Sequence, residues 1–321
     1  MKIFGPVPSR RLGQSLGVNN VKAKTCSYAC VYCQLGITKN LQIKREKFYD
    51  LSNLLKQLED ILKKLKGKNE IIDYITFVAD GEPSLDLNLG EALKEMKKFE
   101  IKTAVISNAS LITEKQVRED LKLADWVSLK VDAVSENIWK KIDRPHGKLN
   151  LAQIKKGIEI FSREYEGQFL TETMLVKGIN DQKSELKKIA DFIKKLNTNH
   201  SYIAVPTRPP AEKFVQKAEP EKINMAYQIF NSRNIKTEYL IGYEGNKFSS
   251  TGDLEKDLLN ITAVHPLKKE AVVELIKKSK SSWKDVEKLI KDHKIIVSNY
   301  NDEKYYLRKW SGYIINGLEK Y

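Results

Sequence analysis

Three cysteines, the only ones in this 321-residue chain, lie within eight positions of one another. Cys26, Cys30 and Cys33 have the spacing Cys-x3-Cys-x2-Cys. Iron–sulfur clusters are held by cysteine thiolates, typically one per iron, so three thiolates on a four-iron cluster leave one iron without a protein ligand. An open coordination position is the usual mark of a catalytic rather than a structural metal site.

Two other interpretations of these thiols stay open. A closed structural zinc site needs four ligands, and the nearest histidine in sequence is His146, so a fourth ligand would come from a distant part of the chain. The second interpretation is that the three cysteines are unrelated buried thiols, because free cysteine is a common core residue. The clustering of all three argues against it, and their odd number in a long chain argues against a disulfide framework.

Short apolar strands alternate with amphipathic helices after the cysteine loop and would position it. This order indicates βα units around a parallel sheet. Six units are too few for an eightfold barrel, and we expect residues 238–241 to add an edge strand. We expect strands at 16–21, 71–78, 101–107, 126–131, 169–176 and 202–205, and helices at 51–66, 86–99, 113–123, 150–163, 183–196 and 219–232.

Polar residues follow successive strands of this pattern, at the end where the chemistry of parallel α/β folds gathers. Taken singly, each has an ordinary explanation as a turn or a helix cap. Their recurrence at the same end of several strands favours a site. The residues are Asp80, Gly81, Glu82, Ser107, Asn108, Lys130, Asp132, Glu172, Thr173 and Arg208.

Arg10 and Arg11 lie in an N-terminal segment rich in proline and glycine, which predicts a rigid, extended entry to the first strand. Guanidinium groups suit bidentate contact with a carboxylate or a phosphate, and an exposed surface pair is an equal alternative. His146 follows the fourth strand and could face the site. No two of the four histidines have metal-ligand spacing, so a histidine zinc site is not indicated.

The chain is basic, with a net charge of +14 and a pI of about 9.3. Residues 1–50 hold nine lysines and arginines against two acidic residues, so the excess lies at the cysteine end. This favours a polyanionic partner about as much as a merely solvated basic surface. No apolar run approaches the length of a membrane span, and no transit segment is present at the start. We therefore expect a cytoplasmic protein without a membrane partner.

The alternation stops near residue 250, which divides the chain into a barrel (1–250) and a smaller domain (251–321). Helices at 254–261, 267–278 and 283–293, followed by strands at 295–297 and 305–307, predict a winged-helix-like domain. The third helix mixes lysines with acidic residues, so duplex reading is disfavoured. Docking of a tRNA backbone or a protein fits better, and simple shielding of the barrel's open side is the alternative.

The cysteine spacing, with an aromatic Tyr32 just before the third cysteine, resembles the signature of the radical S-adenosylmethionine (SAM) superfamily. The resemblance implies a partial (βα)6 TIM-like barrel that holds one [4Fe-4S] cluster. In that family the open iron binds the amino and carboxylate groups of SAM. Reductive cleavage of SAM then gives a 5′-deoxyadenosyl radical, which abstracts a substrate hydrogen.

The resemblance also assigns roles to the residues at the strand ends. Gly81-Glu82-Pro83 is similar to the family's Gly-Gly-Glu element, whose backbone meets the SAM amino group, with Asp80 in place of the first glycine. Tyr32 would lie near the adenine, Ser107 and Asn108 near the ribose, and Lys130 and Asp132 near the ribose or carboxylate. Substrate candidates are Arg10, Arg11, His146, Glu172, Thr173 and Arg208.

Five segments resemble a prokaryotic subgroup that is classed beside the wyosine-base (tRNA imidazoguanosine) synthases. Those synthases also carry cysteines for a second cluster, which this chain lacks, so a pyruvate-condensing reaction is not implied. The segments are 4–13 (Phe-Gly-Pro-Val-Pro-Ser-Arg-Arg-Leu-Gly), 80–83 (Asp-Gly-Glu-Pro), 144–146 (Arg-Pro-His), 207–210 (Thr-Arg-Pro-Pro) and 261–266 (Ile-Thr-Ala-Val-His-Pro).

Three functions follow from these expectations. The first is a radical SAM enzyme that modifies RNA, most plausibly a tRNA base, with an electron donor such as ferredoxin or flavodoxin. The second is a radical SAM enzyme that modifies or activates a polypeptide, as glycyl-radical activases do. The third is a cluster-bearing winged-helix regulator, which the polar strand ends disfavour because a sensor would not need them.

Overall fold

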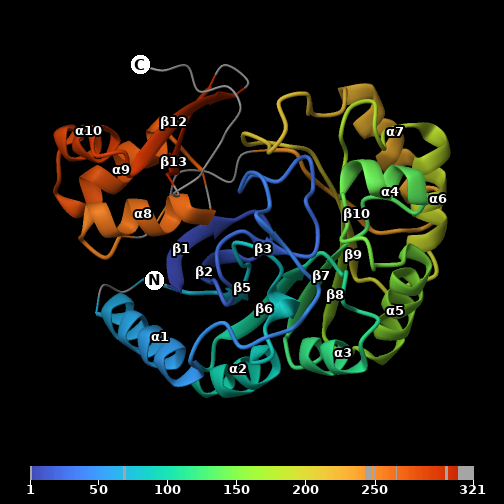
Figure 1. Ribbon diagram of the computed structural model, residues 1–321, viewed down its shortest axis with the longest axis horizontal. Helices are drawn as coiled ribbons and strands as arrows, with labels where there is room; N and C mark the ends of the chain where they lie inside the picture. The colour runs from blue at the N-terminus through green and yellow to red at the C-terminus, as the bar shows by residue number, and fades with distance from the viewer. Residues whose placement is uncertain are drawn as a thin grey trace.

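The computed structural model describes residues 2–67, 70–242, 248, 250–264, 266–300 and 303–309. Within these residues, eight strands form one curled sheet in the order β1-β2-β5-β6-β7-β8-β9-β10. Figure 1 shows helices covering the outer face of this half-barrel. The strands are β1 (Ile3–Ser9), β2 (Gly13–Val18), β5 (Tyr74–Phe77), β6 (Lys102–Ser107), β7 (Trp126–Lys130), β8 (Gln168–Met174), β9 (His200–Ala204) and β10 (Thr237–Leu240).

The parallel run confirms the expected partial α/β barrel. From β2 through β10 every neighbouring pair in the sheet is parallel. The expected edge strand is present as β10, which pairs with β9. The first expected strand (16–21) is displaced, since β2 spans Gly13–Val18.

The N-terminal segment, expected as a rigid, extended entry to the first strand, is itself a strand. β1 pairs antiparallel with β2 and forms one edge of the sheet. Pro6 and Pro8 lack a backbone N–H and are therefore tolerated only at an edge or an irregularity. The register of β1 shifts between Phe4 and Val7, so Pro6 coincides with the irregularity, whereas Pro8 is tolerated because β1 is an edge strand.

The helices begin and end where the sequence provides caps and amphipathic patterns. The Asp50 side chain accepts a hydrogen bond from the Asn53 amide at the start of α1, whose buried face is leucine-rich. The short helix α4 was not predicted, and α2 is shorter than expected and is flanked by 3-10 turns. The helices are α1 (Leu51–Lys66), α2 (Leu89–Met96), α3 (Lys115–Leu121), α4 (Glu136–Ile142), α5 (Leu151–Glu164), α6 (Lys183–Ile193) and α7 (Pro220–Asn231).

Two layers of apolar side chains hold the barrel together. The larger lies between the sheet and the surrounding helices and includes Phe77, Trp139 and Phe161, each fully or almost fully buried. The smaller fills the barrel interior and joins Leu12, after β1, to Leu240, at the end of β10. Burying one such side chain stabilises the fold by roughly 1.5–3 kcal/mol. The interior layer supports the polar site above it.

The C-terminal elements are three helices and a small sheet with strand order β11-β13-β12. The expected second helix begins two residues late, because Leu267–Lys268 form a strand. Part of the hairpin turn (301–302) and His265 lie outside the described residues, and the winged-helix classification stays a prediction. The elements are α8 (Leu254–Val264), β11 (Leu267–Lys268), α9 (Lys269–Ser279), α10 (Trp283–Lys291), β12 (Ile295–Tyr300) and β13 (Glu303–Arg308).

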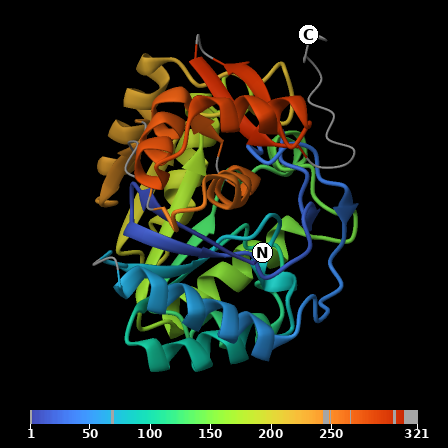
Figure 2. The ribbon, with the colours of Figure 1, turned by 90° about the vertical axis from the view of Figure 1, so that its left-hand side faces the viewer.

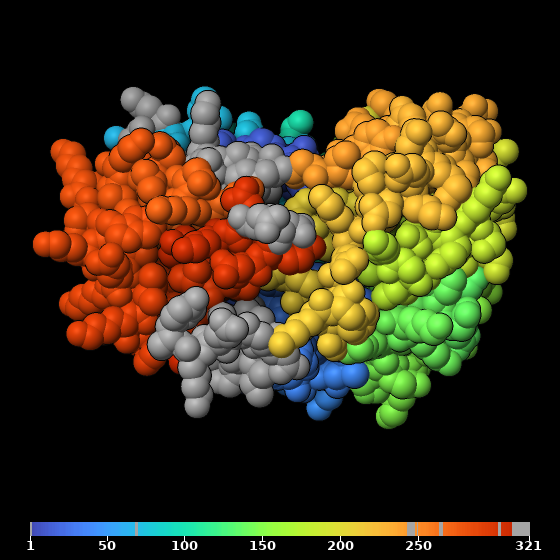
Figure 3. Space-filling model, turned by 90° about the horizontal axis from the view of Figure 1, so that it is seen from above, coloured from blue at the N-terminus to red at the C-terminus, as the bar shows by residue number. Residues whose placement is uncertain are grey.

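These elements pack against β1 and the loop after β9. In Figure 2 they lie on the opposite side of β1 from α1. Phe4 and Val7 of β1 share an apolar core with Leu254 and Leu258 of α8. Seen from above, the C-terminal surface lies beside that of the segment after β9 (Figure 3). β1 and the C-terminal elements therefore build one core.

Candidate functional site

The cysteine loop is held by the segment that follows α4. The amides of Ala29 and Val31 donate to the carbonyls of Asp143 and Ile142, at 3.0 and 2.9 Å. The His146 amide donates to the Ser27 carbonyl at 2.9 Å. The Arg144-Pro145-His146 motif thus braces the loop through its backbone. His146 lies beside the cysteine loop and not among the residues that line the barrel cavity.

The three cysteines are half-buried and lie close to one another, since Cys26 and Cys33 both raise the pKa of Cys30 in addition to burial and the nearby Asp143. Burial, with Glu82 nearby, raises the pKa of Cys26 to about 12. Thiols in such a place remain protonated at neutral pH unless a metal centre supplies positive charge. This donor set therefore fits a cluster.

In the described part of the chain, no three His, Cys, Asp or Glu side chains converge closely enough to bind one metal ion. Cluster thiolates each bind a different iron and so stand farther apart than the ligands of a single ion.

Gly81 brings the end of β5 against the residue that precedes the first cysteine. A Cβ at this position would lie 1.7 Å from the Thr25 carbonyl oxygen, so only glycine allows the approach. The Glu82 amide donates to the same carbonyl at 3.2 Å. The close approach of Thr25 therefore requires glycine at position 81, which is the second glycine of the Gly-Gly-Glu-like element.

Glu82 is a buried carboxylate that ties the end of β5 to the end of β6. One oxygen accepts from the Ser107 hydroxyl at 2.7 Å, and the other accepts from the Asn108 amide at 2.8 Å. The Asn108 side-chain amide in turn donates to the Ser27 hydroxyl at 2.9 Å and lies 3.5 Å from the Cys26 sulfur. Glu82 thus positions Ser107 and Asn108 beside the cysteine loop.

Asp80 is fully buried where the related element has a glycine. Its carboxylate lies 4.0 Å from the Lys24 ammonium, and neither oxygen has a hydrogen-bond donor among the described residues. Burial raises the pKa of Asp80 to about 7, opposed by Lys24 and by Arg308 of the C-terminal sheet. The substitution therefore places a titratable group beside the cysteine loop.

Lys130 and Glu172 lie opposite each other on neighbouring strands and pair inside the barrel. The Lys130 ammonium is 2.5 Å from one Glu172 oxygen, and Arg11 pairs with the other. Thr173 does not join them. Successive strand residues face opposite ways, and the Thr173 hydroxyl donates to the Val131 carbonyl at 2.9 Å. Of these two substrate candidates, only Glu172 is therefore placed beside Lys130 and Arg11.

Tyr32, Asp132 and Asp143 connect the cysteine loop to β7. The Tyr32 hydroxyl donates to Asp132, and the Lys130 ammonium stands 5.2 Å from the centre of the Tyr32 ring. The Cys30 thiol donates to an Asp143 oxygen at 3.3 Å. Burial and the nearby Asp132 raise the pKa of Asp143 well above its usual range. Asp143 was not predicted as a site residue from the sequence, although it directly precedes the Arg144-Pro145-His146 motif.

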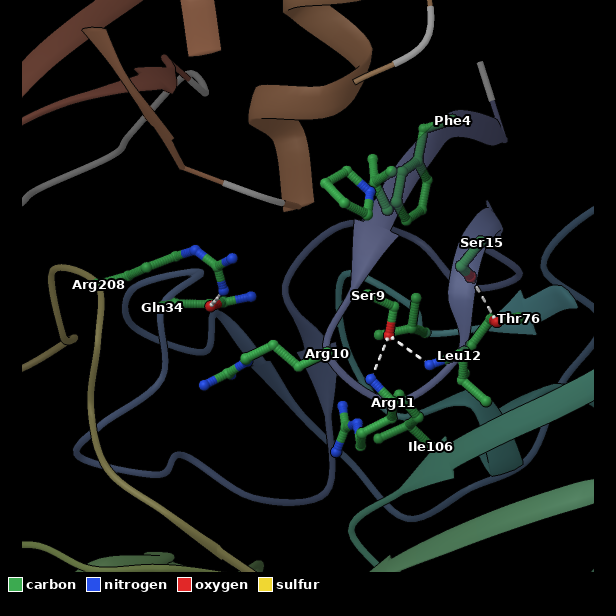
Figure 4. A pocket seen from close by; sticks show the side chains of 13 residues that line it. Phe4, Ser9, Arg10, Arg11, Leu12, Ser15, Gln34, Thr76, Ile106 and Arg208 are labelled. Carbon is green, nitrogen blue, oxygen red and sulfur yellow. Dashed lines mark hydrogen bonds between the residues drawn. The ribbon is translucent and has the colours of Figure 1, made fainter. Parts of the chain in front are cut away.

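Arg10 and Arg208 line a cavity of about 120 Å³, whose wall also includes Ser15 of β2, Thr76 of β5 and Ile106 of β6 (Figure 4). Arg10 donates to the carbonyls of Leu240 and Gly242, and so links the β1–β2 turn to the last strand. Arg208 donates to the Gln34 side chain at 2.7 Å. Gln34, which follows the third cysteine, had not been singled out from the sequence.

Residues 21–193 match the Radical SAM superfamily model, and the chain belongs to this superfamily of enzymes. Such enzymes use a [4Fe-4S] cluster and SAM. The chain is 43% identical over 308 residues to a UPF0026 protein of Methanocaldococcus jannaschii, with 95% of each chain covered. It is therefore also a member of the UPF0026 family.

Two more distant relatives mark the breadth of the superfamily. A probable dual-specificity RNA methyltransferase RlmN of Endomicrobium trichonymphae is 23% identical over 220 residues, covering 65% of this chain and 60% of that protein. A radical SAM methyltransferase from Sphaerobacter thermophilus shares the fold, with a TM-score of 0.54, 15% identity, and 71% and 66% of the two chains covered. Among the described residues, no helix has the length and apolar character to cross a membrane.

Proposed function

We propose that this radical SAM enzyme modifies a base in RNA, with tRNA as the first candidate. The observation that carries the proposal is the joint placement of the cysteine loop and the paired Lys130 and Glu172 at one end of the barrel. A reactive centre bound by the loop would face a polar interior with charges of both signs, which suits a polar substrate such as a base.

The proposed cluster ligands are Cys26, Cys30 and Cys33. When bound there, the cluster and SAM supply reductive cleavage to a 5′-deoxyadenosyl radical that abstracts a hydrogen from the substrate. Glu82 fixes the strand ends around SAM, and the Tyr32–Asp132 hydrogen bond holds the aromatic ring in place. The residues proposed to contact or orient SAM are Tyr32, Asp80, Gly81, Glu82, Ser107, Asn108, Lys130 and Asp132.

Support for RNA comes from three sides. The likeness to a probable RNA methyltransferase RlmN spans 65% of this chain. The first 50 residues carry a strong positive excess, as expected for a polyanionic partner. Among RNAs, tRNA is favoured by the five segments that resemble proteins classed beside the wyosine-base synthases. A cytoplasmic location and a ferredoxin or flavodoxin donor complete the proposal.

The docked C-terminal hairpin does not support the regulator hypothesis. The hydroxyls of Tyr300 and Tyr305 donate to the carbonyls of Pro206 and Thr207, at 3.2 and 2.9 Å. A wing that reads DNA would present its strands to the duplex. Here two of its tyrosines are bonded to the barrel of the same chain.

The proposal is tested with protein reconstituted anaerobically with iron and sulfide. With SAM and dithionite it should release 5′-deoxyadenosine, and bulk tRNA should increase the yield. Binding of tRNA should weaken steeply as salt rises, because phosphate contacts release counterions. If 5′-deoxyadenosine forms but tRNA neither binds nor changes the yield, the RNA assignment fails and a polypeptide substrate becomes the better candidate.

A further inference from the structure

The loop between β9 and α7 contacts several parts of the molecule that are far apart in the chain. We call its residues 206–217 the β9 strap. Val215 of the strap is 2% exposed and belongs to the larger apolar core. The Lys177 amide, after β8, donates to the Gln216 carbonyl at 3.0 Å. Loops are ordinarily more mobile than the elements they connect, and these anchors give the strap a defined position.

The strap contacts the cysteine loop at two points. The Arg208 guanidinium donates to the Gln34 side-chain oxygen at 2.7 Å, and Gln34 directly follows the third cysteine (Figure 4). The Glu212 amide donates at 3.1 Å to the carbonyl of Val31, which directly follows Cys30. Two of the three proposed cluster ligands therefore have a neighbour in sequence that is bonded to the strap.

The segment after α4 contacts the same stretch of the cysteine loop. The Val31 amide donates to the Ile142 carbonyl at 2.9 Å, so both backbone groups of Val31 are hydrogen-bonded. Arg144, two residues after Ile142, forms an ion pair with Glu212 of the strap. The strap, the segment after α4 and the cysteine loop thus form one bonded unit around Val31.

The C-terminal hairpin binds the strap where the strap begins. The Tyr305 hydroxyl donates to the carbonyl of Thr207, the residue before Arg208. A continuous series of contacts therefore leads from β13 through the strap to Gln34, beside the third cysteine. Contiguous contacts of this kind are a physical route by which one part of a protein can influence another.

We propose that Arg208 is a positioning residue of the cysteine loop, and that the C-terminal hairpin acts on this loop through the strap. Removing a group that orients the ligands of a metal centre typically changes metal affinity or activity by about 10–100-fold. Hydrogen bonding and solvent exposure also set the electronic properties of an iron–sulfur cluster. The inference rests on the proposed cluster ligands and is independent of RNA as the substrate.

The first test measures hydrogen exchange of the amides of residues 27–36 in the protein without its cluster. Arg208→Met keeps the length of the side chain and removes the donor to Gln34, so exchange should increase. Tyr305→Phe should increase it less, because it acts through the strap. The matched control is Arg163→Gln, since Arg163 is an exposed helix arginine, and it should exchange as the wild type does. Unchanged exchange in Arg208→Met overturns the inference.

The second test uses the reconstituted protein in the absence of tRNA. We expect Arg208→Met to release iron to a chelator at least tenfold faster than the wild type, and its reduced cluster to have an altered EPR spectrum. A residue that only contacts the substrate would leave both properties unchanged and would weaken tRNA binding. That combination of results also overturns the inference.

A double-variant cycle tests whether Arg208 acts through Gln34. Gln34→Leu removes the acceptor of the hydrogen bond and should also speed iron release. If the two residues act through one contact, the double variant should release iron no faster than the faster single variant. Effects that multiply in the double variant would show independent actions and would contradict the proposed route.

The outcomes separate this inference from the proposed function. If the wild type binds no cluster, the proposed function fails, and hydrogen exchange of the cluster-free protein still decides the inference. If the wild type modifies tRNA and Arg208→Met matches it in exchange, iron release and EPR spectrum, the inference fails and the function stands. Should Arg208→Met not fold, Gln34→Leu carries the same three measurements with the same expected results.

Discussion

At the scale of single residues, the site is built from contacts between positions far apart in the chain. The Cys30 thiol meets Asp143 across 113 positions, and Arg10 meets the Leu240 carbonyl across 230. The cysteine spacing is a local pattern and was readable from the sequence. Asp143 was not, because its importance depends on how α4 returns to the loop. Lys130 and Glu172 were readable as strand-end polar residues, whereas their pairing depended on strand register.

Replacing Cys30 by alanine should remove one cluster ligand. We expect the reconstituted variant to lose most of its bound iron and all release of 5′-deoxyadenosine, because one iron of the cluster has no thiolate. Iron content and product are measured on the same sample, with Arg163→Gln as the control. A Cys30→Ala variant that cleaves SAM at the wild-type rate would remove Cys30 from the ligand set.

Asp86 should make stability fall as the pH rises. It is buried, and burial raises its folded-state pKa to about 6, above the unfolded value of about 3.9. The folded state therefore binds more protons between these values, so the free energy of unfolding decreases from about pH 4 to about pH 6. The full effect is on the order of 2–3 kcal/mol.

Asp86→Asn removes this titration, so its urea midpoint should vary less than the wild-type midpoint between pH 4.5 and 6.5. Asp60→Asn, at an exposed position of α1, is the matched control and should keep the wild-type slope. Parallel pH profiles for wild type and Asp86→Asn would contradict the assignment.

At the scale of elements, the βα alternation was predictable because each helix and strand carries its own periodic pattern. Two elements were not predicted from the sequence. β1 contains two prolines, which argue against a strand unless it lies at an edge, and the edge is a property of the whole sheet. α4 is only seven residues long and buries just Trp139 and Ile142, which gives too weak a period to detect.

The C-terminal hairpin should stabilise the loop that carries Arg208. Tyr305→Phe removes the hydroxyl that donates to the Thr207 carbonyl, so we expect a loss of about 0.5–1.5 kcal/mol. Hydrogen exchange of amides in residues 207–212 should increase. Tyr239→Phe, at an exposed position of β10, is the control. Unchanged exchange in this loop for Tyr305→Phe would mean that the hairpin does not hold it.

At the scale of the whole molecule, the proposed boundary near residue 250 marks a change in the sequence pattern. It does not divide the hydrophobic core that β1 shares with the C-terminal helices. Phe4 and Val7 at the beginning of the chain are buried with Phe248, Leu254 and Leu258. Sequence patterns assign each strand and helix to a local unit and do not reveal which faces meet. The sharing of one core by β1 and α8 was therefore beyond prediction from the sequence.

Removal of residues 251–321 should destabilise the barrel. The deletion exposes the apolar face of β1, because α8 no longer covers it, and exposed apolar patches of this kind promote association. We expect the truncated protein to bind a hydrophobic dye and to melt at a lower temperature than the full chain. A truncated barrel that is monomeric and melts like the full protein would show that the two parts are independent.

The most direct measurement of the central claim compares modified nucleosides in RNA by mass spectrometry. RNA is taken from a strain that lacks this protein, complemented with wild type or with Cys30→Ala. We predict that one modified nucleoside, or one further modification of an existing nucleoside, is present with the wild type and missing with Cys30→Ala. Identical nucleoside spectra from the wild-type, Cys30→Ala and uncomplemented strains would contradict the claim that RNA is the substrate.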